Sequence, residues 1–193
     1  MTDENRIPIE FDELLAAEFD YIAQTATQAN EDRARVSSFY LIAVGSLVAA
    51  LFGTQFFDPN SFTPTVSLMF GGLFVLLTLL GTSTIIQLAR LRAAWYESML
   101  AMNQLKDYMV SENESLARAF RWKTSTLPSK YKRNSVSYFQ AVEVALISGL
   151  MMGAAVFFFQ EVSPPVELLG WIISAVMGTL TIFIQLTIYK RAL

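Results

Sequence analysis

Cysteine and histidine are both missing from the 193 residues of this chain. Their absence excludes disulfides, thiol redox chemistry, metal sites built from Cys or His, and nucleophilic catalysis with a histidine base. The chain also has no paired acids within an apolar run and no glycine-rich phosphate loop. We therefore expect a protein that is not an enzyme and that needs no cofactor and no metal.

Charged side chains are scarce, at 16% of the residues, whereas apolar side chains make up 53%. Soluble domains are about one quarter charged, so this composition is typical of a membrane protein. The formal net charge of −3 does not favour nucleic acid as a partner. The composition instead indicates the lipid bilayer as the main partner.

Four apolar runs are long enough to cross a hydrocarbon core of roughly 30 Å as helices. They cover residues 38–57, 65–88, 136–159 and 166–189. Short polar turns with proline join the first run to the second and the third to the fourth, as between antiparallel helices. We therefore expect an all-α integral membrane protein in which four transmembrane helices form a bundle.

The 14 lysine and arginine residues indicate the orientation of these spans. Three precede the first span, nine lie between the second and the third, two follow the fourth, and the two short turns have none. A soluble helical protein would not sort its cations in this way. The positive-inside rule places the cationic side in the cytoplasm, so we predict a multi-pass protein of the bacterial cytoplasmic membrane with both termini cytoplasmic.

This topology divides the chain into four parts. They are an amphipathic N-terminal segment (1–37), a first hairpin (38–88), a cytoplasmic extension with a basic interfacial segment (89–135), and a second hairpin (136–193).

The second apolar run continues without glycine or proline into residues 88–109, where apolar side chains recur at helical spacing. This pattern predicts one helix from about residue 65 to 110 that projects beyond the membrane. A similar apolar series, interrupted by Arg33, leads into the first span. The two extensions leave adjacent antiparallel spans, and their net charges are −6 for residues 1–37 and +5 for residues 88–133.

We therefore expect the extensions to pair as a cytoplasmic antiparallel stalk, a short coiled coil. The candidate interface comprises Leu15, Phe19, Ile22, Ala26, Ala29, Leu91, Trp95, Met99, Met102 and Met109. Two interpretations stay open. The stalk is either a hairpin closed within one chain, or it also presents a face to other subunits or to a regulatory protein.

Small residues recur every fourth position in three of the spans, a spacing that lets helix backbones approach closely. These candidate packing residues are Gly45, Ala49 and Gly53 in the first span, Gly149 and Gly153 in the third, and Gly170, Ser174 and Gly178 in the fourth. Such faces pack helices within one bundle, or they mark contacts between subunits.

Glu143 is the one acidic or basic residue in the interior of a span, since Glu167 stands at the very start of the fourth. A carboxylate at this depth is costly, so we expect it to be neutral, partnered or beside water. Polar side chains at similar depth complete a candidate polar layer of Glu143, Gln140, Ser83, Thr84, Thr181 and Gln185. The layer lines an ion or proton path, or Glu143 is a hydrogen-bonded or snorkelling structural group.

The N-terminal segment 11–36, the hairpin 39–88 and the extension 90–109 together resemble the SLATT class of bacterial membrane effectors. That class has a cytoplasmic helix, a two-span hairpin and a following cytoplasmic helix. The resemblance implies an effector that oligomerises and permeabilises the membrane when it senses a nucleotide signal or a partner. Residues 93–98 and 120–122 also resemble stretches of uncharacterised bacterial four-span membrane proteins.

Three functions fit these observations. The favoured one is a membrane protein that self-assembles or binds partners through its stalk and small-residue faces, as a pore-forming effector would. The second is a small ion channel or transporter that uses the polar layer around Glu143. The third is an accessory subunit of a larger membrane complex.

Overall fold

The computed structural model of the protein describes residues 11–53, 63–163 and 166–193, and within them it is helical without strands. The long helices are α1 (Phe11–Gly53), α2 (Pro64–Glu112), α3 (Val136–Gln160) and α4 (Leu168–Ala192). Two short 3₁₀ helices, η2 (Glu114–Arg118) and η3 (Thr124–Thr126), lie between α2 and α3. The expected all-α class is confirmed, and all four long helices are long and apolar enough to cross a membrane.

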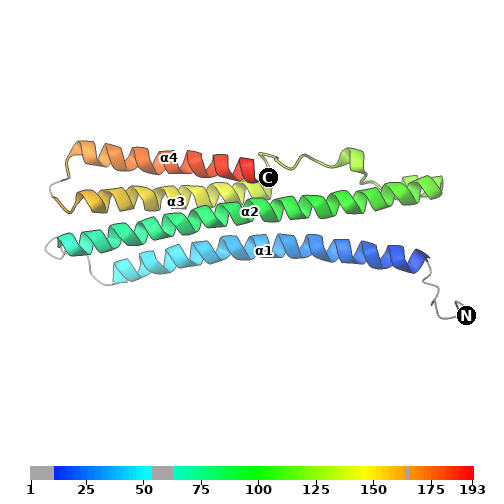
Figure 1. Ribbon diagram of the computed structural model, residues 1–193, viewed down its shortest axis with the longest axis horizontal. Helices are drawn as coiled ribbons and strands as arrows, with labels where there is room; N and C mark the ends of the chain where they lie inside the picture. The colour runs from blue at the N-terminus through cyan, green and yellow to red at the C-terminus, as the bar shows by residue number, and fades with distance from the viewer. Residues whose placement is uncertain (1–10, 54–62, 164–165) are drawn as a thin grey trace, which may run out of the picture.

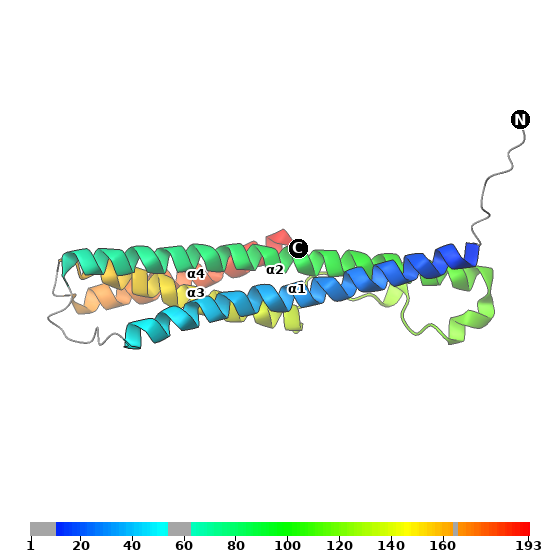
Figure 2. The ribbon, with the colours of Figure 1, turned by 90° about the horizontal axis from the view of Figure 1, so that it is seen from below.

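Two long helices lie beside two shorter ones in the bundle (Figure 1). Helix α2 packs against each of the other three, and α3 packs against α4. Helices α1 and α2 run together beyond the ends of α3 and α4 (Figures 1 and 2). We call this two-helix extension, residues 11–37 of α1 and 89–112 of α2, the stalk.

Helix α2 is the continuous helix that its apolar periodicity predicts. It begins at Pro64, where the Thr63 hydroxyl accepts a hydrogen bond from the Val66 amide (3.4 Å), and it ends at Glu112. Its 49 residues correspond to about 70 Å at 1.5 Å per residue. This length is more than twice the thickness of a hydrocarbon core, so a part of the helix would project from any membrane that it crossed.

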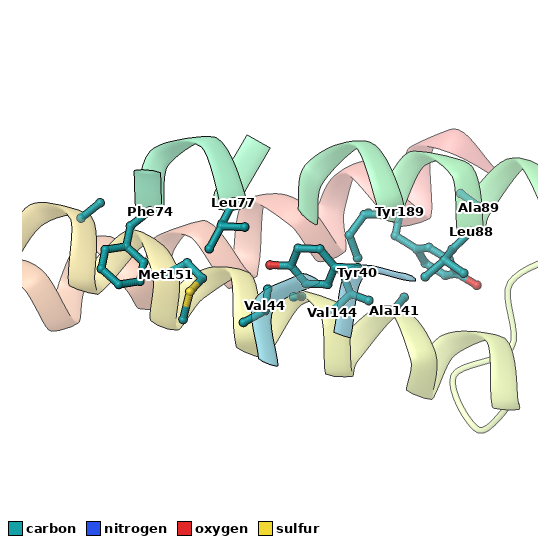
Figure 3. Close-up of a cluster of buried hydrophobic side chains, with 13 residues drawn as sticks. Tyr40, Val44, Phe74, Leu77, Leu88, Ala89, Ala141, Val144, Met151 and Tyr189 are labelled. Carbon is teal, nitrogen blue, oxygen red and sulfur yellow. The ribbon is translucent and has the colours of Figure 1, made fainter. Parts of the chain in front are cut away.

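The core lies where all four helices meet, close to the base of the stalk. Tyr40 of α1 and Tyr189 of α4 point into it from two sides, between α2 and α3 (Figure 3). Many side chains buried there are small: Ala89, Ala141, Ala145 and Ala155 are all fully buried. Small core residues let the helices pack closely, which is the main source of helix association in a bilayer.

Helices α3 and α4 are in backbone contact along their small residues. A Cβ atom added to Gly178 would lie 2.6 Å from the Gly149 carbonyl oxygen, and one added to Gly149 would lie 2.7 Å from the Gly178 carbonyl oxygen. Gly153 meets the backbone of Ser174 in the same way, at 3.2 Å. Gly170 makes room for the side chain of Gln160. The small-residue faces of these two helices therefore pack within one chain.

Candidate functional site

A buried polar cluster joins α2, α3 and α4 in the middle of the bundle. The Gln185 amide donates to the hydroxyl of Ser148 (2.7 Å) and to the hydroxyl of Thr82 (2.9 Å). Thr78 and Ser148 each donate to the other's carbonyl oxygen, at 3.4 and 3.3 Å. These side chains form hydrogen bonds between different helices, so the cluster stabilises the packing of α2, α3 and α4.

Gln185 is the member of the predicted polar layer that lies in this cluster, whereas Glu143 is exposed. Thr84 is buried, and its neighbour Ser83 is exposed. Gln140 and Thr181 are half-buried, and the Thr181 hydroxyl bonds within its own helix, to the Met177 carbonyl. The structure therefore does not bring Glu143 and Gln185 together in one buried layer, and a functional role for these residues stays a prediction.

Helix rotation explains this difference. The buried face of α3 is the stripe Ala141, Val144, Ala145 and Ser148, and Glu143 falls between its members. Sequence reasoning matched residues by depth along the helices, and depth does not fix which face a residue occupies. The Ala141–Ser148 stripe, which follows helical spacing, is the signal that would have identified Ser148 as a core residue.

The α1 half of the stalk packs against α2. Ile22, Ala26 and Ala29 are buried, and Leu15 and Phe19 are half-buried. Because α1 packs along α2, this apolar stripe is buried against α2 of the same chain. The structure thus supports the hairpin interpretation for the α1 part of the stalk.

Sequence analysis missed a second partner of the α2 stalk, the segment 113–135. The Asn103 side chain donates to the Lys123 carbonyl oxygen (3.2 Å), and the Thr124 amide donates to the Asp107 carboxylate (3.2 Å). Figure 1 shows this segment and α1 on different sides of α2. Asn103 and Asp107 are polar, so an analysis of apolar spacing alone passes over both residues.

Three of the predicted interface residues on α2 belong to this second contact. Trp95, Met99 and Met102 line a cavity of about 480 Å³ that they share with residues of the segment 122–135. Leu91 and Met109 are half-buried. The folded-back segment 122–135 therefore lies against part of the stripe that we expected to pair with α1.

Two arginines are buried near the base of the stalk, outside the four predicted spans. Arg33 of α1 is 9% exposed and Arg92 of α2 is 6% exposed. Burial, and then repulsion by Arg92, lowers the pKa of Arg33, and burial lowers the pKa of Arg92. The arginine side chain is not deprotonated in proteins, so both groups carry a positive charge.

No carboxylate in the described residues forms an ion pair with either arginine. Arg33 bonds to Asn30 (2.9 Å), while its Nε and one Nη atom are buried without a hydrogen-bond partner among the described residues. Arg92 stacks on Trp95, with 4.3 Å from the guanidinium carbon to the ring centroid, and donates from Nε to the Lys130 carbonyl (3.3 Å). The base of the stalk therefore concentrates positive charge.

Among the described residues, nothing covers the small-residue face of α1 at Gly45 and Ala49. A Cβ atom added to Gly45 meets nothing within 4 Å, and Ala49 is exposed. The surroundings of Gly53 lie outside the described residues. Unlike the faces of α3 and α4, this face is free to contact another molecule.

In the described chain, four helices have the length and apolarity that multi-pass membrane proteins require, and a two-helix stalk extends from one end of the bundle. The chain matches no protein-family model, no curated protein and no solved structure.

Proposed function

We propose that this is a non-enzymatic protein of the bacterial cytoplasmic membrane that self-assembles through the α1 face carrying Gly45 and Ala49. The observation that carries the proposal is the contrast between two sets of small residues. The space beside the small residues of α3 and α4 is occupied by the opposite helix, whereas Gly45 has open space beside it. Small residues at this spacing are the typical contact face of associating membrane helices.

The position of Glu143 supports the same proposal. It is exposed on α3, about two helical turns from the end of the helix that faces the stalk. An ionisable side chain facing lipid at this depth is costly, and such groups ordinarily face protein or water. Assembly of several copies would cover Glu143 or place it beside water between subunits.

Replacing Gly45 with leucine tests the interface. The open space beside Gly45 means that the single bundle should tolerate leucine, while a close contact with a second α1 would be blocked. We expect a dissociation constant at least tenfold higher, measured by dilution of the protein in detergent with light scattering. Gly72→Leu is the matched control, because Gly72 also has nothing within 4 Å and should leave assembly unchanged. Equal assembly of the two variants would contradict the proposed interface.

The exposed position of Glu143 favours a second function, ion conduction between subunits rather than through one bundle. The pore-forming role that the SLATT resemblance implies would use the same arrangement. A ring of carboxylates lining such a pore would select cations.

We expect Glu143→Gln to lower cation over anion selectivity severalfold in planar bilayers. Glu161→Gln, which removes a carboxylate from the short turn after α3, should not change the selectivity. Unchanged selectivity in the Glu143 variant would exclude a pore lined by this residue.

A further inference from the structure

The cavity at the base of the stalk has the size of a small-molecule site. Its volume is about 480 Å³, within the range of known ligand pockets. One wall is α2 and the other is the returning segment 122–135, which Figure 2 shows looping away from α2 and back. The cavity is therefore formed between α2 and this returning segment rather than in the seam between α3 and α4.

The charge of the lining is one-sided. Arg92, Lys106 and Lys132 line the cavity, and among the described residues no aspartate or glutamate does. Arg92 is 6% exposed and uses only its Nε in a hydrogen bond within the described chain, which leaves its Nη groups available for a ligand. The buried charge of Arg33 lies close enough to Arg92 for repulsion by Arg92 to lower the pKa of Arg33. A buried cation without a paired acid is costly, and a bound anion would offset that cost.

The N-terminus of α3 borders the cavity. Ser135, which lines it, is the N-cap of the 25-residue helix α3, and its hydroxyl accepts from the Tyr138 amide (3.2 Å). The first backbone N–H groups of a helix have no partner within the helix, and the helix dipole favours negative charge there. Arg92, Lys132 and this terminus supply the donors that phosphate groups use in proteins.

The rest of the lining is apolar and aromatic. Trp95 and Met99 lie on the α2 wall, and Trp122 and Leu127 lie on the opposite wall. Trp122 is 61% exposed, so a large indole face is open to a ligand. This wall suits the carbon part of an amphipathic anion better than it suits an inorganic ion.

We propose that this cavity binds a phosphate ester. The phosphate lies near Arg92, Lys132 and the N-terminus of α3, and the organic part lies along Trp95 and Trp122. Two sources carry this chemistry: the headgroup of an anionic lipid at the membrane border, and a soluble phosphate ester. The site does not depend on self-assembly, so its test is independent of the oligomeric state.

The first arm uses a soluble probe, 1-naphthyl phosphate, titrated by calorimetry into the protein in phosphatidylcholine nanodiscs, with empty nanodiscs as the baseline. We expect Lys132→Gln to weaken binding at least tenfold. Arg121→Gln removes an exposed cation from the same segment outside the cavity lining and should bind like the wild type. Trp122→Ala should lower the affinity for 1-naphthyl phosphate severalfold and leave the affinity for inorganic phosphate unchanged.

The second arm uses native mass spectrometry of the protein released from phosphatidylglycerol nanodiscs. Phosphatidylglycerol retained by the wild type and lost from Lys132→Gln identifies the lipid headgroup as the ligand. Binding in the first arm alone identifies a soluble ester. The proposal is overturned if neither probe binds, or if Lys132→Gln and Arg121→Gln match the wild type in both arms.

Discussion

Leucine in place of Gly178 is expected to lower the free energy of unfolding by about 3 kcal/mol, at the upper end of the usual cost of overpacking. The reason is that a Cβ atom there would already lie 2.6 Å from the Gly149 carbonyl oxygen and 3.6 Å from the Gly153 backbone nitrogen. Backbone atoms cannot rotate aside as a side chain can, so α3 and α4 would have to separate. The measurement is reversible unfolding in mixed micelles, followed by circular dichroism.

Gly72→Leu is the control for the effect of leucine itself. Gly72 lies within the span of α2 and has nothing within 4 Å, so the same change there adds a side chain to open space. We expect its free energy of unfolding to stay within about 0.5 kcal/mol of the wild type, as for surface substitutions elsewhere. A Gly178 variant as stable as the Gly72 variant would show that α3 and α4 are not in backbone contact.

Methionine in place of Arg33 is expected to have a large effect of the opposite sign, raising the free energy of unfolding by about 1–3 kcal/mol. Arg33 is 9% exposed, two of its guanidinium nitrogens lack partners among the described residues, and the nearby charge is Arg92. Burying a charge without compensation costs several kcal/mol. This cost exceeds the stabilisation that the single hydrogen bond from Arg33 to Asn30 contributes. Methionine would also continue the apolar stripe of α1.

The matched control is Arg35→Met, two residues further along α1. Arg35 is exposed and pairs with Asp32 at 3.3 Å, so its loss should change the free energy of unfolding by no more than about 0.5 kcal/mol. Both variants are compared by thermal unfolding in a zwitterionic detergent without phosphate. A clear loss of stability in the Arg33 variant alone would contradict our interpretation of Arg33 as a destabilising buried charge.

Features that depend on one helix at a time could be predicted from the sequence. The length of α2 follows from an apolar series that no glycine or proline interrupts after residue 81, and the structure confirms it to Glu112. The buried stripe Ile22, Ala26 and Ala29 follows from helical spacing in the same way. The side of the membrane on which the stalk lies stays a prediction from the distribution of cations.

Features that depend on how one helix is rotated against the next could not be predicted. Glu143 and Gln185 are both polar residues inside spans, yet one is exposed and the other is buried in a hydrogen-bonded cluster. Nor does spacing distinguish Gly178, which touches Gly149, from Gly45, which touches nothing. The difference is set by the neighbouring helix, and a single sequence does not state which helix that is.

The fold-back of residues 113–135 was missed for a different reason. Its anchors are polar contacts with single residues, Asn103 to Lys123 and Asp107 to Thr124, rather than a periodic apolar face. The contact of this segment with α2 gives the stalk a candidate ligand site besides its role in helix pairing. It turns an apolar stripe expected to pair with α1 into one wall of a cationic cavity.

Self-assembly through α1 is the central claim, and the mass of the intact protein in lipid nanodiscs tests it most directly. Native mass spectrometry should find a defined multiple of the 21.6 kDa chain. A single chain in every nanodisc, at protein-to-lipid ratios that allow several, would contradict the claim. The open face of α1 would then have to be explained by contact with lipid or with a different protein.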